Sequence, residues 1–512
     1  MQPIQVTAKG VEKLLTRLNP RKASGSDGIP TNFLKICAKE LSHPLAFVIQ
    51  QSIHQRAVPN DWREATVTPV FKKGPKTIPA NYRPVSLTSV CCKIAEHIIV
   101  SQTMSHLETN NLLSIFQHGF RRKRSCETQL LITTHDLASA MNRKSQVDIA
   151  VLDFEKAFDK VAHQRLIRKL YHLNLNQDVI GWIHSFLSRR TQRVVVDSYS
   201  SDSAPVTSGV PQGTVVGPML FLIYIDDITE GITSSVRLFA DDCLLYREIR
   251  SHEDTVTLQR DLDQLHAWSS RWQMNFNIKK CNIMSVTNKR KNAIKTTYSM
   301  NGQPFDRVDT IEYLGVSLSN KLTWNAHINK ITGNAKRTLG FLRRTLQHTN
   351  QTIRLNTYRT LVRPKLEYAA TIWDPHHATQ INQLEKVQKT AARYIMGKPA
   401  RKSPNQESAS QMVKHLKLDS LLERRRQARC TMMFKLTRNL IAVPATYHPQ
   451  KMQQHQNTRR SATFFQVHQP TVDCYKFSFI PRTIVDWNSL PVSVTSTETL
   501  EAFKSALQKS TL

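Results

Sequence analysis

Three aspartates in the middle of the chain suggest metal-dependent chemistry. Asp153 closes an apolar run, and Asp241 and Asp242 lie between two short apolar runs, residues 236–239 and 243–246. These two runs predict a β-hairpin with the acids at its tip. Adjacent carboxylates repel each other and raise each other's pKa unless a cation neutralises them. Mg²⁺ binds carboxylates together with phosphate oxygens and water, so we interpret the three aspartates as ligands of two such ions in phosphoryl transfer.

Each acidic feature alone has a simpler explanation. An Asp-Asp pair is usually a solvated turn, and an aspartate between a strand and a helix is often a helix cap. Asp159, for example, is expected to cap the amphipathic helix that carries Leu166, Ile167 and Leu170. The metal-site interpretation therefore depends on the segments around the acids.

The chain carries a large excess of positive charge. Its 512 residues include 71 Lys and Arg against 39 Asp and Glu, which gives a formal net charge of +32. A surplus of this size favours a polyanionic partner, of which nucleic acid is the commonest. A solvated basic surface, or one attracted to membranes, would show the same charge.

The cysteines and the apolar runs indicate an intracellular protein without a membrane span. Eight cysteines are scattered along the chain, with Cys91 and Cys92 adjacent and no Cys-x-x-Cys pair. This is neither a disulfide framework nor a zinc-ligand pattern. The longest apolar run, Val215–Ile225, contains Gly217 and Pro218 and is too short to cross a bilayer. The amino terminus also lacks the layout of a secretory signal.

The elements that hold the aspartates are expected to be a mixture of helices and strands. Apolar residues at helical spacing predict helices, and alternating apolar residues predict strands. The patterns predict a helix over 11–18, a loop over 19–28, a helical stretch over 32–54, a strand over 65–71 with a turn at 72–75, mixed elements over 147–284, mostly helices after 321 and a polar linker at about 397–410. The three acids thus fall in the α/β part of the chain.

The segments around the acids resemble the reverse transcriptases of non-LTR retrotransposons. Leu152–Asp159 is similar to the first catalytic motif of that family, Phe239–Asp242 to its aromatic-x-Asp-Asp motif, and the intervening Ser208–Pro218 to its Gln-Gly motif. Further segments resemble family motifs in the same order: the fingers motif at 81–87, the element after it at 117–121, the motif after the catalytic hairpin at 277–281 and the primer-grip region at 313–316.

The resemblance continues after the palm motifs. Four later segments are similar to jockey-like LINE elements: residues 361–369, 373–375, 384–389 and 481–491. The resemblance therefore covers nearly the whole chain.

This resemblance implies the fold and the domain order. The expected fold is that of a right-hand polymerase of the α/β (α+β) class, with fingers, palm and thumb followed by a mostly helical, basic C-terminal region. The expected boundaries are 1–53 for an N-terminal extension and the start of the fingers, 54–319 for the reverse transcriptase domain with fingers and palm, 320–400 for a helical thumb-like region and 401–512 for the basic C-terminal region. Family members usually carry an endonuclease ahead of the polymerase, and the chain is expected to lack it.

The resemblance also assigns roles to the acidic centre. Asp153, Asp241 and Asp242 correspond to the metal ligands, with the Phe154 carbonyl as a further oxygen ligand. Phe158 corresponds to the bulky residue under the sugar, which leaves no room for a 2′-hydroxyl and so favours deoxynucleotides. An ordinary core phenylalanine is the alternative for Phe158.

The remaining assignments concern the nucleotide, the leaving group and the primer. The residues expected to contact the nucleotide are Lys72, Lys73, Arg83, Phe158, Gln212 and Gly213. Lys280 is a candidate general acid for the leaving pyrophosphate, and the primer grip is assigned to Tyr313, Leu314 and Gly315. A solvated basic turn is the alternative for the two adjacent lysines, and an exposed structural lysine is the alternative for Lys280.

The implied activity is RNA-directed DNA synthesis from a 3′-hydroxyl by a two-metal mechanism. The implied cofactors are two Mg²⁺ ions, with Mn²⁺ as a substitute. The implied partners are an RNA template, a DNA primer, dNTPs and a ribonucleoprotein with the element's own RNA, with no membrane. The implied location is the nucleus, with a cytoplasmic ribonucleoprotein stage.

Two other interpretations compete with this one. The first is a catalytically inactive, retroelement-derived nucleic-acid-binding protein, and the intact Asp153, Asp241 and Asp242 argue against it. The second is another polymerase with the same palm, either an RNA-dependent RNA polymerase or an intron maturase. Phe158 disfavours RNA synthesis, and the C-terminal resemblance disfavours a maturase.

Overall fold

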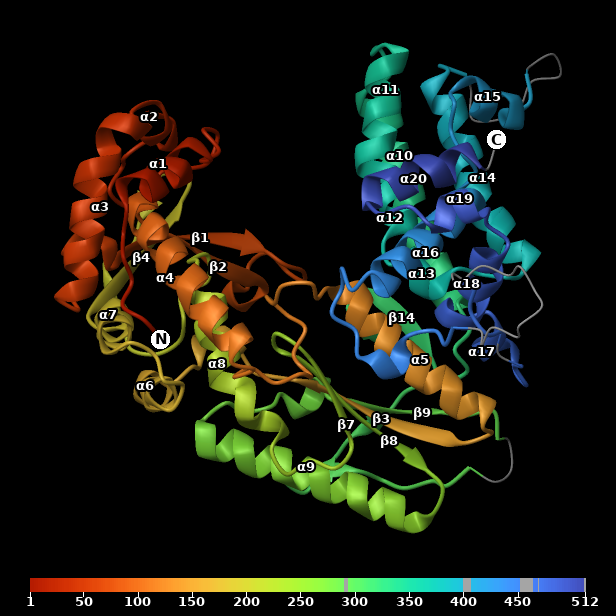
Figure 1. Cartoon of the computed structure of the whole chain (residues 1–512), viewed down its shortest axis with the longest axis horizontal. Helices are drawn as coiled ribbons and strands as arrows, with labels where there is room; N and C mark the ends of the chain where they lie inside the picture. The colour runs from red at the N-terminus through yellow and green to blue at the C-terminus, as the bar shows by residue number, and fades with distance from the viewer. Residues whose placement is uncertain (290–292, 399–406, 452–463, 468, 511–512) are drawn as a thin grey trace.

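A five-stranded sheet in the middle of the chain holds the predicted acids at one end (Figure 1). The computed structural model describes residues 1–289, 293–398, 407–451, 464–467 and 469–510. The strand order is β12-β9-β3-β8-β7, and only the β12–β9 pair is parallel. The strands are β3 (Gln146–Asp153), β7 (Ser235–Phe239), β8 (Asp242–Ile249), β9 (Asn282–Val286) and β12 (Asp306–Arg307).

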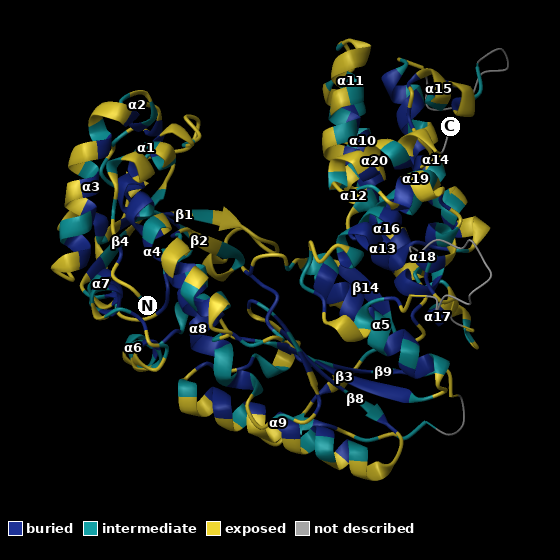
Figure 2. Cartoon of the chain, in the orientation of Figure 1, coloured by how far each residue is buried: buried dark blue, intermediate teal, exposed yellow. Residues whose placement is uncertain are grey.

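This sheet separates two hydrophobic cores. Successive side chains of a strand point to opposite faces, so Leu152 and Leu245 join one core whereas Ile149 and Leu244 join the other. The first face is covered by α9 (His252–Trp272) and the second by α5 (Cys126–Asn142). The buried strands between these helices are visible in Figure 2. Packing on both faces fixes the register of β3 and β8, because a slip by one residue would exchange their two faces.

The N-terminal half of the chain builds a second sheet on the first core. Its order is β2-β1-β4-β5, with β6 paired to β4, and the contact between β1 and β4 is parallel. The strands are β1 (Glu64–Phe71), β2 (Tyr82–Leu87), β4 (Arg190–Val196), β5 (Tyr199–Ser200) and β6 (Ala204–Val206). The helices around it are α1 (Ala8–Thr16), α2 (Thr31–Ile36), α3 (Ala38–His54), α4 (Val90–Thr109), α6 (His163–Tyr171), α7 (Gln177–Leu187) and α8 (Val216–Ile225).

The C-terminal half is mostly helical and surrounds the second core. Buried residues on both sides of position 400, such as Leu384 and Phe434, share this core. The helices are α10 (Asn325–Thr345), α11 (Gln351–Thr357), α12 (Arg363–Glu367), α13 (Ala370–Trp373), α14 (Ala378–Ile395), α15 (Ala409–His415), α16 (Leu421–Thr437), α17 (Asp473–Lys476), α18 (Phe479–Asn488), α19 (Val492–Thr495) and α20 (Leu500–Lys509). Two small hairpins precede them: β10 (Ser299–Met300) with β11 (Gln303–Pro304), and β13 (Thr310–Tyr313) with β14 (Val316–Ser319). In Figure 1 these helices lie on the right and the N-terminal helices α1–α3 on the left, with the central sheet lower in the view.

The structure confirms the α/β class and most of the local predictions. The helix at 11–18, the strand at 65–71, the hairpin around the paired acids and the helical region after 321 are all present. The helical stretch at 32–54 is two helices that meet at Cys37, and the apolar run 215–225 is the helix α8. The linker predicted at about 397–410 lies largely outside the described residues, and α15 already begins at Ala409.

The predicted role of Asp159 as a helix cap is wrong. The helix α6 begins at His163, and its N-cap residue is Ala162. Asp159 lies in the preceding turn, Ala157–Asp159, where its carboxylate accepts a hydrogen bond from the Gln212 side chain. The Asp159 carboxylate therefore binds Gln212, which is distant in sequence, instead of capping the next helix.

Candidate active site

The strand pairing brings the predicted acids together. Asp153 is the last residue of β3 and lies directly opposite Asp242, the first residue of β8. Directly opposed residues of an antiparallel pair have Cβ atoms roughly 4.5–5.5 Å apart. Asp241 belongs to the two-residue turn that connects Phe239 to Asp242, and its turn partner Ala240 has a φ of +52°. Acids 89 positions apart in sequence thus share one end of the sheet.

The electrostatics of this end are those of crowded carboxylates. Both Asp241 and Asp242 have exposed surface, but the surrounding walls exclude much of the water around their carboxylates. This loss of solvation, followed by repulsion from Asp241 and Asp153, raises the pKa of Asp242 to about 6. The pKa of Asp241 is raised mainly by the same loss of solvation and also by Asp153, whereas Lys72 and Arg83 act in the opposite direction.

A lysine already pairs with one acid. The ammonium nitrogen of Lys280 lies 3.3 Å from a carboxylate oxygen of Asp153, and both side chains are about half exposed. Lys280 ends the short turn Ile278–Lys280, which is tied to β3 because the Asn277 N–H donates to the Asp153 carbonyl at 2.7 Å. Lys280 thus lies beside Asp153, and its role as a general acid stays a prediction.

Carboxylates are suitable ligands for a divalent cation, but in this conformation the three aspartates do not surround a common point. Within the described part of the chain, no three His, Cys, Asp or Glu side chains are close enough together to hold a metal ion. Opposed carboxylates, one of which has a pKa raised by lost solvation and by its neighbours, are nevertheless the groups that a hard cation would neutralise. Asp153, Asp241 and Asp242 are the residues that would hold it, and Phe154 lines the cleft beside Asp153.

A cleft of about 1110 Å³ opens beside the acids and joins the two sheets. Several predicted nucleotide-binding residues line it together with the acids: Lys72, Arg83, Asp153, Phe154, Phe158, Gln212, Asp241 and Lys280. Lys73 is exposed in the turn after β1 and is not among the lining residues. The cleft therefore combines an acidic floor with cations from the β1–β2 sheet.

Phe158 is fixed in the cleft by two other rings. It stacks on Phe221 of α8, with ring centroids 4.5 Å apart, and Phe120 meets it edge-on at 6.4 Å. Phe158 is half-buried and also lines the cleft, so one side of the ring packs on the core while another faces the cavity.

The loop that contains Gln212 and Gly213 is held from two sides. The Gln212 carbonyl accepts from the Ser86 N–H at 2.7 Å, and its side-chain amide donates to Asp159 at 3.0 Å. Gly213 has a φ of +107°, and a Cβ there would lie 2.7 Å from the Ser86 carbonyl oxygen. The position therefore requires glycine both for its backbone angle and for its close approach to β2.

The hairpin β13–β14 lies on the second core, outside the lining of the cleft. Its turn residues, Leu314 and Gly315, have φ values of +46° and +80°, as tight two-residue hairpin turns require. Tyr313 is buried, and its hydroxyl accepts from the Gln129 side chain at 3.1 Å. The predicted primer-grip residues are thus a separate element from the acidic centre.

Sequence reasoning gave no role to two buried side chains that support the site. Glu96 of α4 is fully buried and accepts from the Val215 and Val216 N–H groups, at the start of α8 directly after the Gln212 loop. Gln117 contacts the turn of the acidic hairpin. The only sequence signal was that Gln117 lies in one of the family-like segments, and Glu96 had none.

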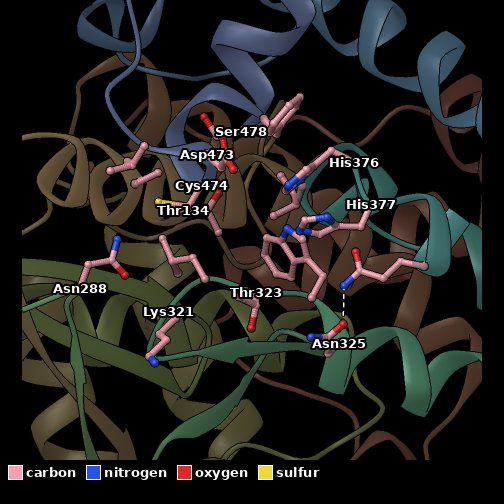
Figure 3. Close-up of a pocket in the computed structure, with 17 residues that line it drawn as sticks. Thr134, Asn288, Lys321, Thr323, Asn325, His376, His377, Asp473, Cys474 and Ser478 are labelled. Carbon is pink, nitrogen blue, oxygen red and sulfur yellow. Dashed lines mark hydrogen bonds between the residues drawn. The ribbon is translucent and has the colours of Figure 1, made fainter. Parts of the chain in front are cut away.

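A second cavity, of about 300 Å³, lies on the other side of α5 and contains none of the predicted site residues (Figure 3). It is lined by parts of α5, the β14–α10 loop, the start of α14 and α17, including Lys321, His376 and Asp473. The His376 ring stacks on Phe477 with centroids 3.9 Å apart. The cavity thus lies within the helical half, apart from the acidic centre.

Acids that lie beside lysines and an arginine in one cleft are the side chains that reactions of phosphate groups use. Comparison with known proteins defines the class more narrowly. Residues 70–318 match the reverse transcriptase (RNA-dependent DNA polymerase) family. The chain therefore carries a reverse transcriptase domain over these residues, in agreement with the resemblance found in its motifs.

Several of the similar proteins come from Drosophila mobile elements. The chain is 28% identical over 407 residues to the RNA-directed DNA polymerase from mobile element jockey of Drosophila melanogaster, covering 77% of this chain and 44% of that protein. It is 27% identical to the probable RNA-directed DNA polymerase from transposon X-element of the same species, covering 76% and 43%. The chain is also 27% identical to the corresponding protein from transposon BS, covering 78% and 45%. The chain spans less than half the length of these relatives.

None of the described helices is both long and apolar enough to cross a membrane.

Proposed function

We propose that the chain is an RNA-directed DNA polymerase that extends a 3′-hydroxyl primer with dNTPs. The observation that carries the proposal is the register that sets Asp153 opposite Asp242, beside Asp241 and a cleft that also contains lysines and an arginine, inside a reverse transcriptase domain. The names of the similar proteins support the same reaction. The net charge of +32 suits a nucleic-acid substrate.

The acids and the cations of the cleft would act on the same triphosphate. Asp153, Asp241 and Asp242 would hold divalent cations, Mg²⁺ or Mn²⁺, which would neutralise phosphate charge and lower the pKa of the primer hydroxyl. Lys72 and Arg83 line the cleft near these acids and would bind the outer phosphates, where a guanidinium makes paired hydrogen bonds.

Three other cleft residues would shape the nucleotide site. Phe158, fixed by Phe221, would pack against the sugar and exclude a 2′-hydroxyl. Gln212 would lie along the nucleotide and template. Lys280, close to Asp153, would donate a proton to the departing pyrophosphate.

The architecture fits a right hand around a primer–template duplex. The β1–β2–β4 sheet with α1–α3 would be the fingers, the β3–β7–β8–β9 sheet with α9 the palm, and the helices from α10 onward the thumb and C-terminal region. The β13–β14 turn would contact the primer. We further propose an RNA template, a ribonucleoprotein with the element's own RNA, and action in the nucleus after a cytoplasmic stage, by kinship with the similar proteins.

Primer extension tests the proposal directly. The purified chain would be given a DNA primer on an RNA template, dNTPs and Mg²⁺, beside Asp241→Ala and the matched control Asp263→Ala on the exposed face of α9. Wild type and the control should synthesise DNA, and Asp241→Ala should lose synthesis while keeping its fold by circular dichroism. Tight, salt-sensitive RNA binding without any synthesis by the wild type would overturn the proposal and favour an inactive nucleic-acid-binding protein.

A further inference from the structure

We propose that Gln117 is a positioning residue that sets the conformation of the Ala240–Asp241 turn and, through it, the location of the Asp241 carboxylate. The inference rests on the proposed function, because it names a residue that acts through Asp241. Gln117 does not line the cleft, so it would not touch the nucleotide.

The Gln117 side chain closes onto the backbone of the turn. It is 2% exposed. Its Oε1 accepts from the Ala240 N–H at 2.9 Å and from the Gly119 N–H at 2.7 Å, and its Nε2 makes a longer contact of 3.5 Å to the Ala240 carbonyl. One amide group thus contacts both the N–H and the carbonyl of the same turn residue.

The segment that carries Gln117 is itself tied to the hairpin. The Leu238 N–H donates to the Phe116 carbonyl at 3.1 Å, and the His118 N–H donates to the Leu238 carbonyl at 2.9 Å. Gly119 lies against the turn so closely that a Cβ there would come within 2.4 Å of the Ala240 nitrogen. Two backbone hydrogen bonds and the close approach of Gly119 therefore hold Gln117 against the turn.

The turn needs such support because of its own sequence. Ala240 has a φ of +52°, in the left-handed region that is unfavourable for a residue with a Cβ. Its N–H is buried, and a buried donor that loses its partner is costly. Without Gln117 the turn should relax toward other conformations, and Asp241, the next residue, would move with it. Because the site depends on the placement of carboxylates, small displacements should reduce turnover strongly.

The decisive variant is Gln117→Ala, compared with Gln388→Ala as a matched control. Gln388 is an equally buried glutamine in α14 that bonds to Tyr358 and to the Asp419 carbonyl, remote from the acidic hairpin. In primer extension, Gln117→Ala should lower kcat by about 10- to 100-fold and raise the Mg²⁺ concentration needed for half-maximal rate. The KM for dNTP should change less. Gln388→Ala should cost thermal stability but leave kcat and the Mg²⁺ requirement near those of wild type.

A second substitution separates positioning from general damage. Glycine adopts positive φ freely, so Ala240→Gly should restore part of the activity of Gln117→Ala while having little effect alone. No recovery in the double variant, or an equal loss of kcat in Gln388→Ala, would overturn the inference.

Hydrogen exchange tests the inference without relying on activity. In Gln117→Ala the amide of Ala240 should exchange faster than in wild type, whereas amides of β9 should not change. Unchanged exchange at Ala240 would contradict the role of Gln117 in positioning the turn, even if polymerase activity were lost. The wild type could instead be inactive while only Gln117→Ala shows fast exchange at Ala240. That result would support the positioning role of Gln117 and show that the proposed function fails.

Discussion

The carboxyl group of Asp242 links pH to the stability of the acidic centre. Its pKa is raised from 3.8 to about 6 by poor solvation and by Asp241 and Asp153. A raised acid pKa means that the folded state binds the proton more tightly than the unfolded state, so the ionised group destabilises the fold above about pH 6. Without divalent metal, Asp242→Asn should therefore be more stable than wild type at pH 8.

This gain should shrink as the pH falls from about 6 to 4 and vanish below that range. Urea unfolding at pH 4, 6 and 8 with a chelator would measure it, with Asp263→Asn on α9 as the control for loss of a surface charge. A stabilisation that is the same at all three pH values would contradict the assignment.

The ring of Phe158 should control sugar selection. The ring is held by Phe221 and faces the cleft, so it cannot rotate away from a bound sugar without losing that stacking. Phe158→Val should raise ribonucleotide incorporation relative to deoxynucleotide incorporation by about 10- to 100-fold, because a hydroxyl is rejected mainly by bulk. Competitive primer extension with rGTP and dGTP would measure this ratio. Phe158→Tyr keeps the ring and should stay close to wild type; a Val variant with unchanged selectivity would make Phe158 an ordinary core residue.

At the scale of elements, α4 and α8 are joined through one buried carboxylate that supports the Gln212 loop. Glu96 accepts from the Val215 N–H at 2.5 Å and the Val216 N–H at 2.9 Å, and so satisfies donors at the start of α8. Glu96→Ala should cost about 2 kcal/mol by leaving these donors without a partner. It should also raise the KM for dNTP, because the loop before α8 would loosen.

Thermal unfolding and steady-state primer extension would measure the two effects of Glu96. Glu96→Gln, which keeps an acceptor oxygen, should lose less of both. A destabilised Glu96→Ala with an unaltered KM would show that α8 and the Gln212 loop are independent.

The sequence predicted those elements whose signals are local. The apolar run before Asp153 and the two runs around the paired acids became β3, β7 and β8, because strands buried on both faces appear in a sequence as short continuous apolar runs. The family-like motifs also indicated the acids that meet at the end of the sheet and most of the predicted residues that line the cleft.

The supporting contacts could not be predicted because they join distant residues. Gln117 and Ala240 are separated by 123 positions, and Glu96 and Val215 by 119. Asp159 is an example of a local prediction that a long-range contact overrode. Its residue type favours a helix cap, but its carboxylate accepts a hydrogen bond from Gln212, 53 positions away. A single sequence shows which residues can donate or accept, whereas only the fold decides which of them meet.

At the scale of the whole molecule, the net charge of +32 should dominate affinity for the template. Phosphate contacts release counterions, so the logarithm of the association constant should fall linearly with the logarithm of salt concentration. Fluorescence anisotropy with a labelled RNA–DNA hybrid between 50 and 300 mM KCl, chosen as roughly the range where such contacts respond, would measure the slope. Asp241→Ala should keep the same slope, because it changes the reacting centre and not the cations. A salt-independent affinity would contradict a phosphate-based grip.

The C-terminal helices are bound to the rest of the helical half by a buried ionic cluster. Asp374, which follows α13, is 3% exposed and pairs with Arg425 at 2.5 Å, with Arg482 at 3.3 Å and with Arg429. The three arginines belong to α16 and α18, beyond residue 401. One carboxylate before residue 400 thus neutralises cations that come from the C-terminal region.

Removing that carboxylate should be far more harmful than removing a surface one. Asp374→Asn leaves buried guanidinium groups with too little negative charge, which typically costs about 3–5 kcal/mol. Asp309→Asn, at an exposed position, should change stability by less than about 0.5 kcal/mol. Thermal unfolding would compare the two, and adding Arg425→Met to Asp374→Asn should recover part of the loss because one unpaired buried charge is then gone. If Asp374→Asn unfolds at the wild-type temperature, the cluster does not hold the C-terminal region. A chain ending at residue 400 should aggregate in either case, because it would leave the core shared with the C-terminal helices uncovered.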